Sequence, residues 1–409
     1  MRDLKSILIG VAIPLAAIPS ASAWGFVGHE VVATIAQIHL HPSVFPNMCT
    51  ALNFTSTDPD VPLCHLAPPA TWADRARFKM RWSAPMHYIG AVGDYPRQTC
   101  QFPGDHGWVG RKGYNVLEAI RNVTTLLEDW TADSVPSFTD DDTANEAIKF
   151  LIHFLGDMHM PLHLTDRDRG GNSDKVMFGN KESNLHSVWD SLLINKAVRV
   201  TPRNYSRPLP IPQIEFNLRG TIYDSYVRRI MWEGIMGQWK DEVESWLTCP
   251  PPSPAKDLDW SWGQSILSVW NQLSGKEGIS IDTDDETICP YHWAKPVHAL
   301  NCEIVWPAAL DEPPYTHARL SDDTDDCHDH DDFALLEDDF ASKPRTPKPH
   351  PKYLQLDTPE YAGAVEKEFV IEKLLAQGGI RLAGVLNYLF ASVEGQSDIR
   401  ASKLRIVTV

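Results

Sequence analysis

The chain reads HFLGDMHMPLHLTDRDRGGN at residues 153–172 and NLHSVWD at residues 184–190. This stretch contains two pairs of a histidine and an aspartate four residues apart, with one further histidine between them: His153 and Asp157, His186 and Asp190, and His163. Residues four apart lie on one face of a helix, so each pair can direct an imidazole and a carboxylate at one ion. A single pair is usually a salt bridge or a hydrogen-bonded core histidine. Two pairs with a fifth donor, all nitrogen or oxygen, predict a metal site and favour Zn²⁺.

The residues around this stretch predict a helical fold. Apolar side chains at helical spacing, from Ala147 to Leu155, run past the first pair until Pro161 interrupts them. Similar periodicity recurs at residues 28–40, 114–130, 144–160, 221–247, 286–304 and 359–389, whereas alternating strand patterns are scarce. The connections are rich in proline, notably at residues 201–212, 249–254 and 343–351. We therefore expect an all-α, mainly helical single domain with long loops.

The first 23 residues have the pattern of a secretory signal peptide. Arg2 and Lys5 precede an apolar run at residues 7–18, and a small-x-small motif follows at residues 21–23. Cleavage there would leave Trp24 as the first residue of a domain at residues 24–409. No later stretch is apolar for long enough to cross a bilayer, so we expect a soluble, secreted protein. Three N-glycosylation sequons agree with secretion: Asn53, Asn122 and Asn204.

Charge and cysteine content narrow the possible functions. A formal net charge of −17 argues against a nucleic-acid binder that works through a basic surface, so an anionic substrate would need a local positive centre such as bound metal.

An acidic and proline-rich insertion at about residues 320–352, which contains DDTDDCHDHDD, is expected to be a mobile solvated loop. A minor alternative gives His328 and His330 a metal-scavenging role. Among the seven cysteines, Cys327 in this insertion is the one expected to remain unpaired.

Further motifs extend the pattern along the chain. They are WGFVGHE at residues 24–30, TWAD at 71–74 followed by Arg77, PMHYI at 85–89, GGN at 170–172, NC at 301–302 and GGIRLA at 378–383. Together with the histidine-rich stretch, these motifs resemble the zinc-dependent single-strand-specific nucleases and 3′-nucleotidases of fungi and plants, the nuclease S-one and nuclease P-one family. The resemblance covers nearly all of the chain after residue 23, except the loops near residues 249–259 and 320–352.

The resemblance implies a mostly helical domain, of the type shared by phospholipase C and nuclease P-one, around three Zn²⁺ ions. Position by position, one ion would take Asp74, His87, His153 and Asp157, and a second would take His163, His186 and Asp190. The third would take the amino nitrogen and carbonyl oxygen of Trp24, His29, and Asp157 as a bridging ligand. The family pattern also suggests a disulfide between Cys100 and Cys302. Proximity and elimination then favour Cys49 with Cys64 and Cys249 with Cys289, although sequence alone does not fix the connectivity.

The chemistry of this set of ligands is that of phosphoester hydrolysis. Three doubly charged ions against three carboxylates, those of Asp74, Asp157 and Asp190, would leave a cationic pocket that selects phosphate. A water shared by two ions would lose its proton near neutral pH and attack phosphorus in line, while the third ion would hold the leaving oxygen. Arg77, three residues after Asp74, would neutralise charge on the phosphoryl oxygens, unless it only forms a surface ion pair. The expected catalytic residues are Asp74, Arg77 and Asp157.

Two residues are expected to bind the substrate. Tyr88 follows His87 and can stack an unpaired base, although core packing is an equal alternative. Asn172 can contact the substrate or simply belong to a turn. Several family members have an aspartate where this chain has Gly90, so the missing carboxylate predicts a weakened purine preference.

The expected function is that of a secreted, monomeric, zinc-dependent endonuclease. It would hydrolyse the phosphodiester bonds of single-stranded DNA and RNA to 5′-phosphate products, and would also act as a 3′-nucleotidase. A zinc-dependent phospholipase C is one alternative, because it shares the trinuclear site. A non-catalytic secreted metal-binding protein is another, but the complete set of ligands and Arg77 favour an enzyme.

Overall fold

The computed structural model describes residues 24–103, 106–132, 137–250, 284–318, 353–391 and 404–409. Three segments discussed above lie outside the described residues: the expected signal peptide, most of the 249–259 loop, and the acidic insertion with Cys327, His328 and His330.

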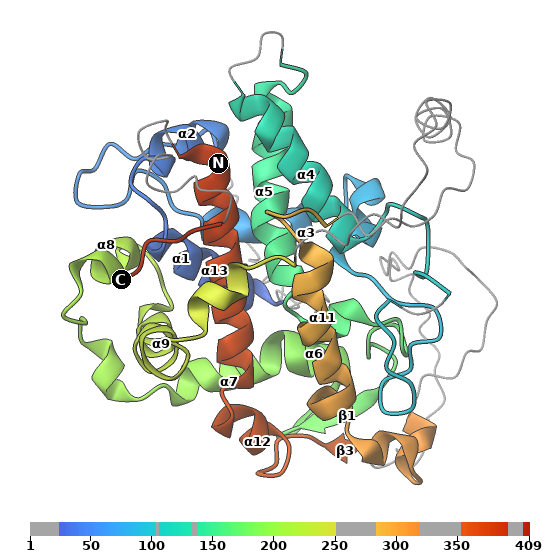
Figure 1. Ribbon diagram of the computed structural model, residues 1–409. Helices are drawn as coiled ribbons and strands as arrows, with labels where there is room; N and C mark the ends of the chain where they lie inside the picture. Colours follow the sequence, from blue (N-terminus) through green and yellow to red (C-terminus); the bar gives the residue numbers. More distant parts are fainter. Residues whose placement is uncertain (1–23, 104–105, 133–136, 251–283, 319–352, 392–403) are drawn as a thin grey trace, which may run out of the picture.

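Helices dominate the described chain (Figure 1). They are α1 (Phe26–Ile38), α2 (Val44–Ala51), α3 (Trp72–Ala76), α4 (Val116–Thr131), α5 (Asp141–Asp157), α6 (Leu185–Ser187), α7 (Leu193–Val200), α8 (Pro212–Leu218), α9 (Asp224–Arg229), α11 (Pro290–Leu300), α12 (Ala362–Lys367) and α13 (Val370–Phe390). Short 3₁₀ and π segments extend or join several of them, including Arg81–His87, Pro161–Leu164, Val188–Leu192, Ile230–Gln238 and Val243–Leu247. The predicted all-α class is confirmed.

The sheet in the described residues is small. Its strands are β1 (Lys175–Phe178), β2 (Lys181–Asn184) and β3 (Leu354–Gln355), in the order β2-β1-β3. β1 pairs antiparallel with β2 and parallel with β3, with Val176 opposite Leu354. The hairpin of β1 and β2 leads directly into α6, so it helps to place His186 at the start of that helix.

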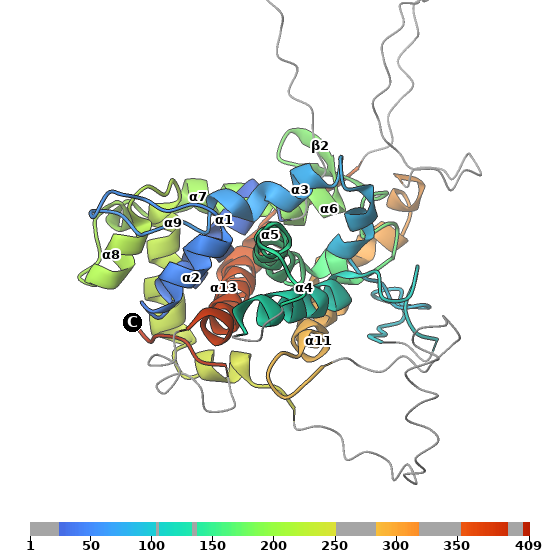
Figure 2. The ribbon, with the colours of Figure 1, turned by 90° about the horizontal axis from the view of Figure 1, so that it is seen from above.

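The long C-terminal helix α13 forms the centre of the fold. It packs against α1, α2, α4 and α5, and its side chains are buried along nearly its whole length. Figure 2 shows α13 between α2 and α4, with α1 and α5 beside it. The buried apolar side chains form one cluster that reaches from Trp24 to Leu404. Packing of this kind stabilises helices more than their intrinsic propensity does.

Local sequence explains where α5 begins and ends. The carboxylate of Asp140 accepts a hydrogen bond from the backbone nitrogen of Thr143 at 2.8 Å, which caps the helix, and Asp141 and Asp142 lie in the first turn, where negative charge is favourable. The helix ends at Asp157, shortly before Pro161. Its last turn therefore carries the first histidine and aspartate pair into the core.

Two of the predicted helices are broken. Residues 221–247 form α9, a π segment and a 3₁₀ segment, because the chain turns at Gly237 and the ring of Trp239 packs against Gly234. Residues 359–389 form α12 and α13, because Phe369 adopts a left-handed conformation with φ of 56°. In both cases the folded backbone departs from the continuous helical periodicity of the sequence.

The structure has disulfides between Cys49 and Cys64, Cys100 and Cys302, and Cys249 and Cys289, which are the three pairs expected. The sequon residues Asn53, Asn122 and Asn204 are all exposed, and their glycosylation stays a prediction. Among the described helices, none combines the length and the apolar character that a bilayer span requires.

Candidate metal centre

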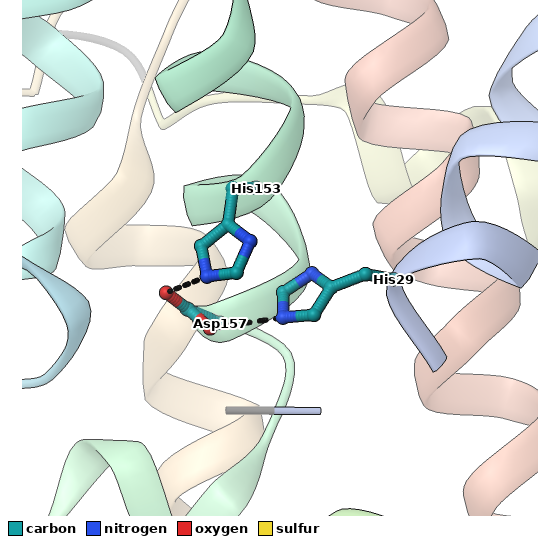
Figure 3. A group of neighbouring side chains, drawn as sticks. All are labelled: His29, His153 and Asp157. Carbon is teal, nitrogen blue, oxygen red and sulfur yellow. Dashed lines mark ion pairs between the residues drawn. The ribbon is translucent and has the colours of Figure 1, made fainter. Parts of the chain in front are cut away.

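The carboxylate of Asp157, at the end of α5, lies at the centre of a buried cluster of imidazoles. His153, one turn earlier, places Nε2 3.3 Å from Asp157 Oδ2, and His87 places Nδ1 2.9 Å from the same oxygen. His29 on α1 stacks on the ring of His153 with centroids 3.8 Å apart, and its Nε2 lies 3.4 Å from Asp157 Oδ1 (Figure 3). The side chains of His29, His153 and Asp157 are completely buried.

Eight of the nine predicted ligands fall into three neighbouring groups. In each group one donor atom per residue lies within 4.8 Å of the others: His29, His153 and Asp157; Asp74, His87 and His153; and His163, His186 and Asp190. The third group contains all the ligands predicted for one ion. The first two groups share His153. They differ from the predicted sets in how His153 and Asp157 are divided between them, and they do not include Trp24. All of these side chains are buried.

Backbone carbonyls fix the orientation of three histidines. His153 Nδ1 lies 2.7 Å from the carbonyl oxygen of Ala70, His163 Nδ1 lies 2.8 Å from that of His87, and His186 Nδ1 lies 2.8 Å from that of Gly170. A carbonyl oxygen can only accept, so Nδ1 carries the proton in each ring and Nε2 of the neutral ring keeps a lone pair. This hydrogen bonding of the second nitrogen is typical of metal-ligating histidines.

Burial and mutual interaction shift the pKa values of the acidic and imidazole groups in the cluster. Burial raises the pKa of Asp190 well above its ordinary value, and the nearby carboxylates of Asp74 and Asp157 raise it further. Burial opposes charge on His153, but Asp157 and Asp74 prevail and raise its pKa to about 9. Burial also lowers the pKa of His163 to about 3, so this ring is neutral. Three acidic groups crowded in a low-dielectric core favour a bound cation.

Several buried polar atoms of the cluster make no hydrogen bond with the described part of the chain. These are Nδ1 of His29, Nε2 of His87 and Oδ1 of Asp190. Nε2 of His29 and Oδ1 of Asp157 make no hydrogen bond either, and lie 3.4 Å apart as an ion pair. Buried polar atoms are normally satisfied, and one left without a partner destabilises the fold by about 1–3 kcal/mol. Nitrogen and carboxylate donors left available in this way fit Zn²⁺.

Gly156 is a residue of the centre that the sequence patterns did not single out. A Cβ atom added there would lie 2.5 Å from Nδ1 of His29, so only glycine allows the His29 ring to lie against α5. The signal was present in the sequence as a glycine inside an otherwise apolar helical stretch. Such a glycine often marks a close approach between two elements.

Trp24 lies beside the third group. The backbone nitrogen of Gly25 donates a hydrogen bond to the carbonyl oxygen of Asp190 at 2.8 Å, and the Trp24 side chain is completely buried. The first peptide unit after Trp24 is therefore held against the segment that carries Asp190. A ligand role for the Trp24 amino group stays a prediction.

A cleft of about 370 Å³ opens onto the cluster. Its lining includes the predicted ligands His87, His163 and His186 and also Arg77, Tyr88, Asp166, Arg169 and Asn172. Arg77 Nη1 lies 3.9 Å from Asp74 Oδ1, so this side chain forms an ion pair and faces the cleft as well. The ring of Tyr88 is 52% exposed rather than packed in the core. The side chain of Asn172 donates to the carbonyl oxygen of Arg169 at 2.9 Å, as a turn residue does, while lining the cleft.

Gly90 lies directly against Asp166, which the sequence patterns had not marked. A Cβ atom at position 90 would lie 2.5 Å from Cβ of Asp166 and 2.8 Å from its backbone nitrogen. A side chain at position 90 therefore does not fit this backbone. The exposed carboxylate of Asp166 lines the cleft, and its partial desolvation there raises its pKa. The place of Asp166 at the cleft could not be predicted from the sequence, because its contact with Gly90 joins two segments that are far apart in the chain.

Comparisons with known proteins agree with this geometry. The family model described as S1/P1 Nuclease matches residues 24–323, which is more than half of the chain. Endonuclease 2 of Arabidopsis thaliana is 30% identical over 272 residues, covering 66% of this chain and 84% of the relative. Endonuclease 3 of the same plant is 26% identical over 393 residues, covering 95% and 97%. Nuclease S1 of Aspergillus oryzae is 34% identical over 176 residues, covering 42% and 55%. The chain belongs to the S1/P1 nuclease family.

Proposed function

We propose that this protein is a zinc-dependent endonuclease that cleaves single-stranded DNA and RNA to 5′-phosphate products and also hydrolyses 3′-nucleotides. Membership of the nuclease family makes the chain a hydrolase of phosphodiester bonds. The observation that carries the proposal is the orientation of His153, His163 and His186, whose Nδ1 atoms each donate to a backbone carbonyl, beside a buried set of aspartates. Rings held in this way present Nε2 to a metal ion.

The residues present divide the work between holding metal and binding phosphate. Asp74, Asp157, Asp190, the histidines of the three groups and the Trp24 amino group would hold three Zn²⁺ ions. Bound zinc supplies Lewis-acid charge and a nucleophilic water at neutral pH. Arg77, at the mouth of the cluster, donates to the phosphoryl oxygens and so balances the negative charge that builds up in the transition state. Tyr88 offers its exposed ring to an unpaired base, and Asn172 also lines the cleft.

Secretion and a monomeric state are part of the same proposal. Removal of residues 1–23 would free the Trp24 amino group, and the family match also begins at residue 24. The three disulfides suit an oxidising compartment.

The test is to assay the secreted mature protein on four substrates, with and without chelator. The substrates are denatured DNA, RNA, 3′-AMP and phosphatidylcholine. We expect hydrolysis of the first three, loss of activity with chelator, and recovery with Zn²⁺, which metal analysis should find at three ions per chain. Release of phosphocholine without any mononucleotide would instead identify a phospholipase C. Firm zinc uptake without hydrolysis of any substrate would identify a metal-binding protein.

A further inference from the structure

A basic and aromatic segment connects two predicted zinc ligands, Asp74 and His87. We call residues 75–82, which read RARFKMRW, the basic-aromatic segment. Residues 75–88 contain four lysines and arginines and no aspartate or glutamate, although the whole chain has a net charge of −17. This local reversal of sign lies next to the cleft, so it concentrates positive charge where a polyanion would approach.

Two large rings of this segment are open to solvent. The side chain of Phe78 is 62% exposed and that of Trp82 is 53% exposed. Each ring also has a neighbour that helps to hold it: the guanidinium of Arg77 lies 5.6 Å from the Phe78 ring centroid, and the ring of Phe150 lies 5.8 Å from that of Trp82. A ring that is held by a neighbour and still more than half exposed offers a surface for stacking.

Both rings are connected to the cleft, Phe78 through one side chain and Trp82 through a short row of aromatic rings. Arg77, which contacts Phe78, lines the cleft itself. Phe150, which contacts Trp82, stacks on Phe154, and Phe154 meets the ring of His87 edge-on. The exposed rings therefore continue outward from the site at which Tyr88 and the zinc ligands lie. Isolated exposed apolar residues are common on protein surfaces. Exposed rings that alternate with cations beside the cleft are instead typical of a binding surface.

We propose that Phe78 and Trp82 form a second base-stacking surface, outside the cleft, for nucleotides of the single strand next to the one being cleaved. Lys79 and Arg81 lie between the two rings in sequence and are exposed, so they contact the phosphates between those bases. Alternating rings and cations fit a single strand, because every unpaired base has a π face and every linkage a negative charge. A duplex keeps its bases stacked inside and cannot use the rings. This inference rests on the proposed function and names residues that select a polynucleotide over a mononucleotide.

The test compares binding of short and long strands by the zinc-loaded enzyme. The probes are fluorescent phosphorothioate oligothymidylates of two and twelve nucleotides, which resist hydrolysis, measured by anisotropy. The variants are Phe78→Ala and Trp82→Ala, with Phe138→Ala as the matched control. Phe138 is 93% exposed but precedes α5 at the end opposite Asp157. Thermal unfolding of each variant verifies that the fold is intact.

We expect each of the two variants to weaken binding of the twelve-nucleotide strand about tenfold relative to the dinucleotide, and the control to weaken neither. The double variant Lys79→Gln with Arg81→Gln should reduce the salt dependence of long-strand binding by about 0.7 in logarithmic slope for each cation removed. Unchanged long-strand binding, or equal weakening of both probes, would overturn the proposal. If the wild type binds the long strand in this way but cleaves no natural nucleic acid, the proposed function fails while the stacking surface stands.

Discussion

His153 and His159 lie six residues apart, one on the last turn of α5 and the other just after it, yet they belong to different kinds of site. Both rings are completely buried. Both place Nδ1 against a backbone carbonyl, His153 at 2.7 Å from Ala70 and His159 at 2.6 Å from Leu155. The second nitrogens differ: Nε2 of His153 faces the carboxylate of Asp157, whereas Nε2 of His159 lies 2.7 Å from the guanidinium of Arg381.

The charge opposite Nε2 distinguishes the two sites. Asp157 and Asp74 raise the pKa of His153 to about 9 against the effect of burial, so this ring attracts a cation or a proton. Burial, and then the positive charge of Arg381, lower the pKa of His159 well below its usual value. His159 is thus a neutral acceptor for Arg381, whose own pKa burial lowers to about 9. Arg381 also donates to the carbonyl oxygen of Trp246 at 2.9 Å, so it joins α13 to neighbouring segments.

Removing the charge at the first site should have the largest effect on activity. In Asp157→Asn the shape is kept, but the carboxylate that faces His29, His87 and His153 is lost. We expect at least one zinc ion to be lost and kcat/KM on denatured DNA to fall at least about 1,000-fold, equivalent to ~4 kcal/mol. Metal analysis and steady-state kinetics measure both effects.

The matched control for this variant is His159→Gln, which removes a buried imidazole of the same turn that faces Arg381. It should keep all of its zinc and lose stability instead. An Asp157→Asn protein with full zinc content and normal rate would show that the two sites do not differ as described.

Removing the charge at the second site should act on stability. Arg381→Met leaves Nε2 of His159 and the carbonyl oxygen of Trp246 buried without their donor. We expect the free energy of unfolding to fall by about 3 kcal/mol, because each orphaned buried acceptor destabilises the fold by about 1–3 kcal/mol. Urea unfolding measures this change, and zinc content and KM for 3′-AMP should remain those of the wild type. Loss of zinc with unchanged stability would reverse the assignment of the two sites.

The fold could be predicted from sequence where local and long-range preferences agree. α5 has both a capping aspartate and an apolar stripe at helical spacing, so its existence and its burial followed from the residues alone. The break at Gly237 did not, because it depends on the ring of Trp239 packing against Gly234. The left-handed Phe369 between α12 and α13 gave no signal either, since nothing in an apolar stripe marks one residue as a turn.

The candidate site, like the fold, has parts that could be predicted from the sequence and parts that could not. Donor residues at ligand spacing, such as His153 with Asp157, could be found because their chemistry is visible in the sequence. Whether a given histidine faces a carboxylate or a guanidinium could not, because Arg381 comes from the last helix of the fold. Gly156 and Asp166 were missed for a related reason: each matters through a contact with a distant segment, Gly156 with His29 and Asp166 with Gly90.

The smallest expected effect concerns base preference. It depends on the carboxylate of Asp166, which lies at the cleft and not in either of the two buried sites. Asp166 lies beside Tyr88 at the edge of the cleft, and its side chain has no hydrogen-bond or ion-pair partner among the described residues. Burial raises the pKa of Tyr88, and the nearby negative charge of Asp166 raises it further, so the two groups lie close together. An unpaired carboxylate beside a stacking ring can accept hydrogen bonds from the edge of a bound base.

In Asp166→Ala we therefore expect the preference among homopolymers to fall by about fivefold, or ~1 kcal/mol, leaving rates on purine and pyrimidine strands nearly equal. With Gly90 lacking a side chain, Asp166 is the carboxylate at this edge that can retain any purine preference of the wild type. Rates on poly(A) and poly(U) measure the change, and Asp168→Asn is the control, because that carboxylate pairs with Arg167. Zinc content should stay the same, since Asp166 belongs to none of the three ligand groups. An unchanged ratio of rates would mean that neither position 90 nor Asp166 reads the base, and that stacking on Tyr88 alone sets the preference.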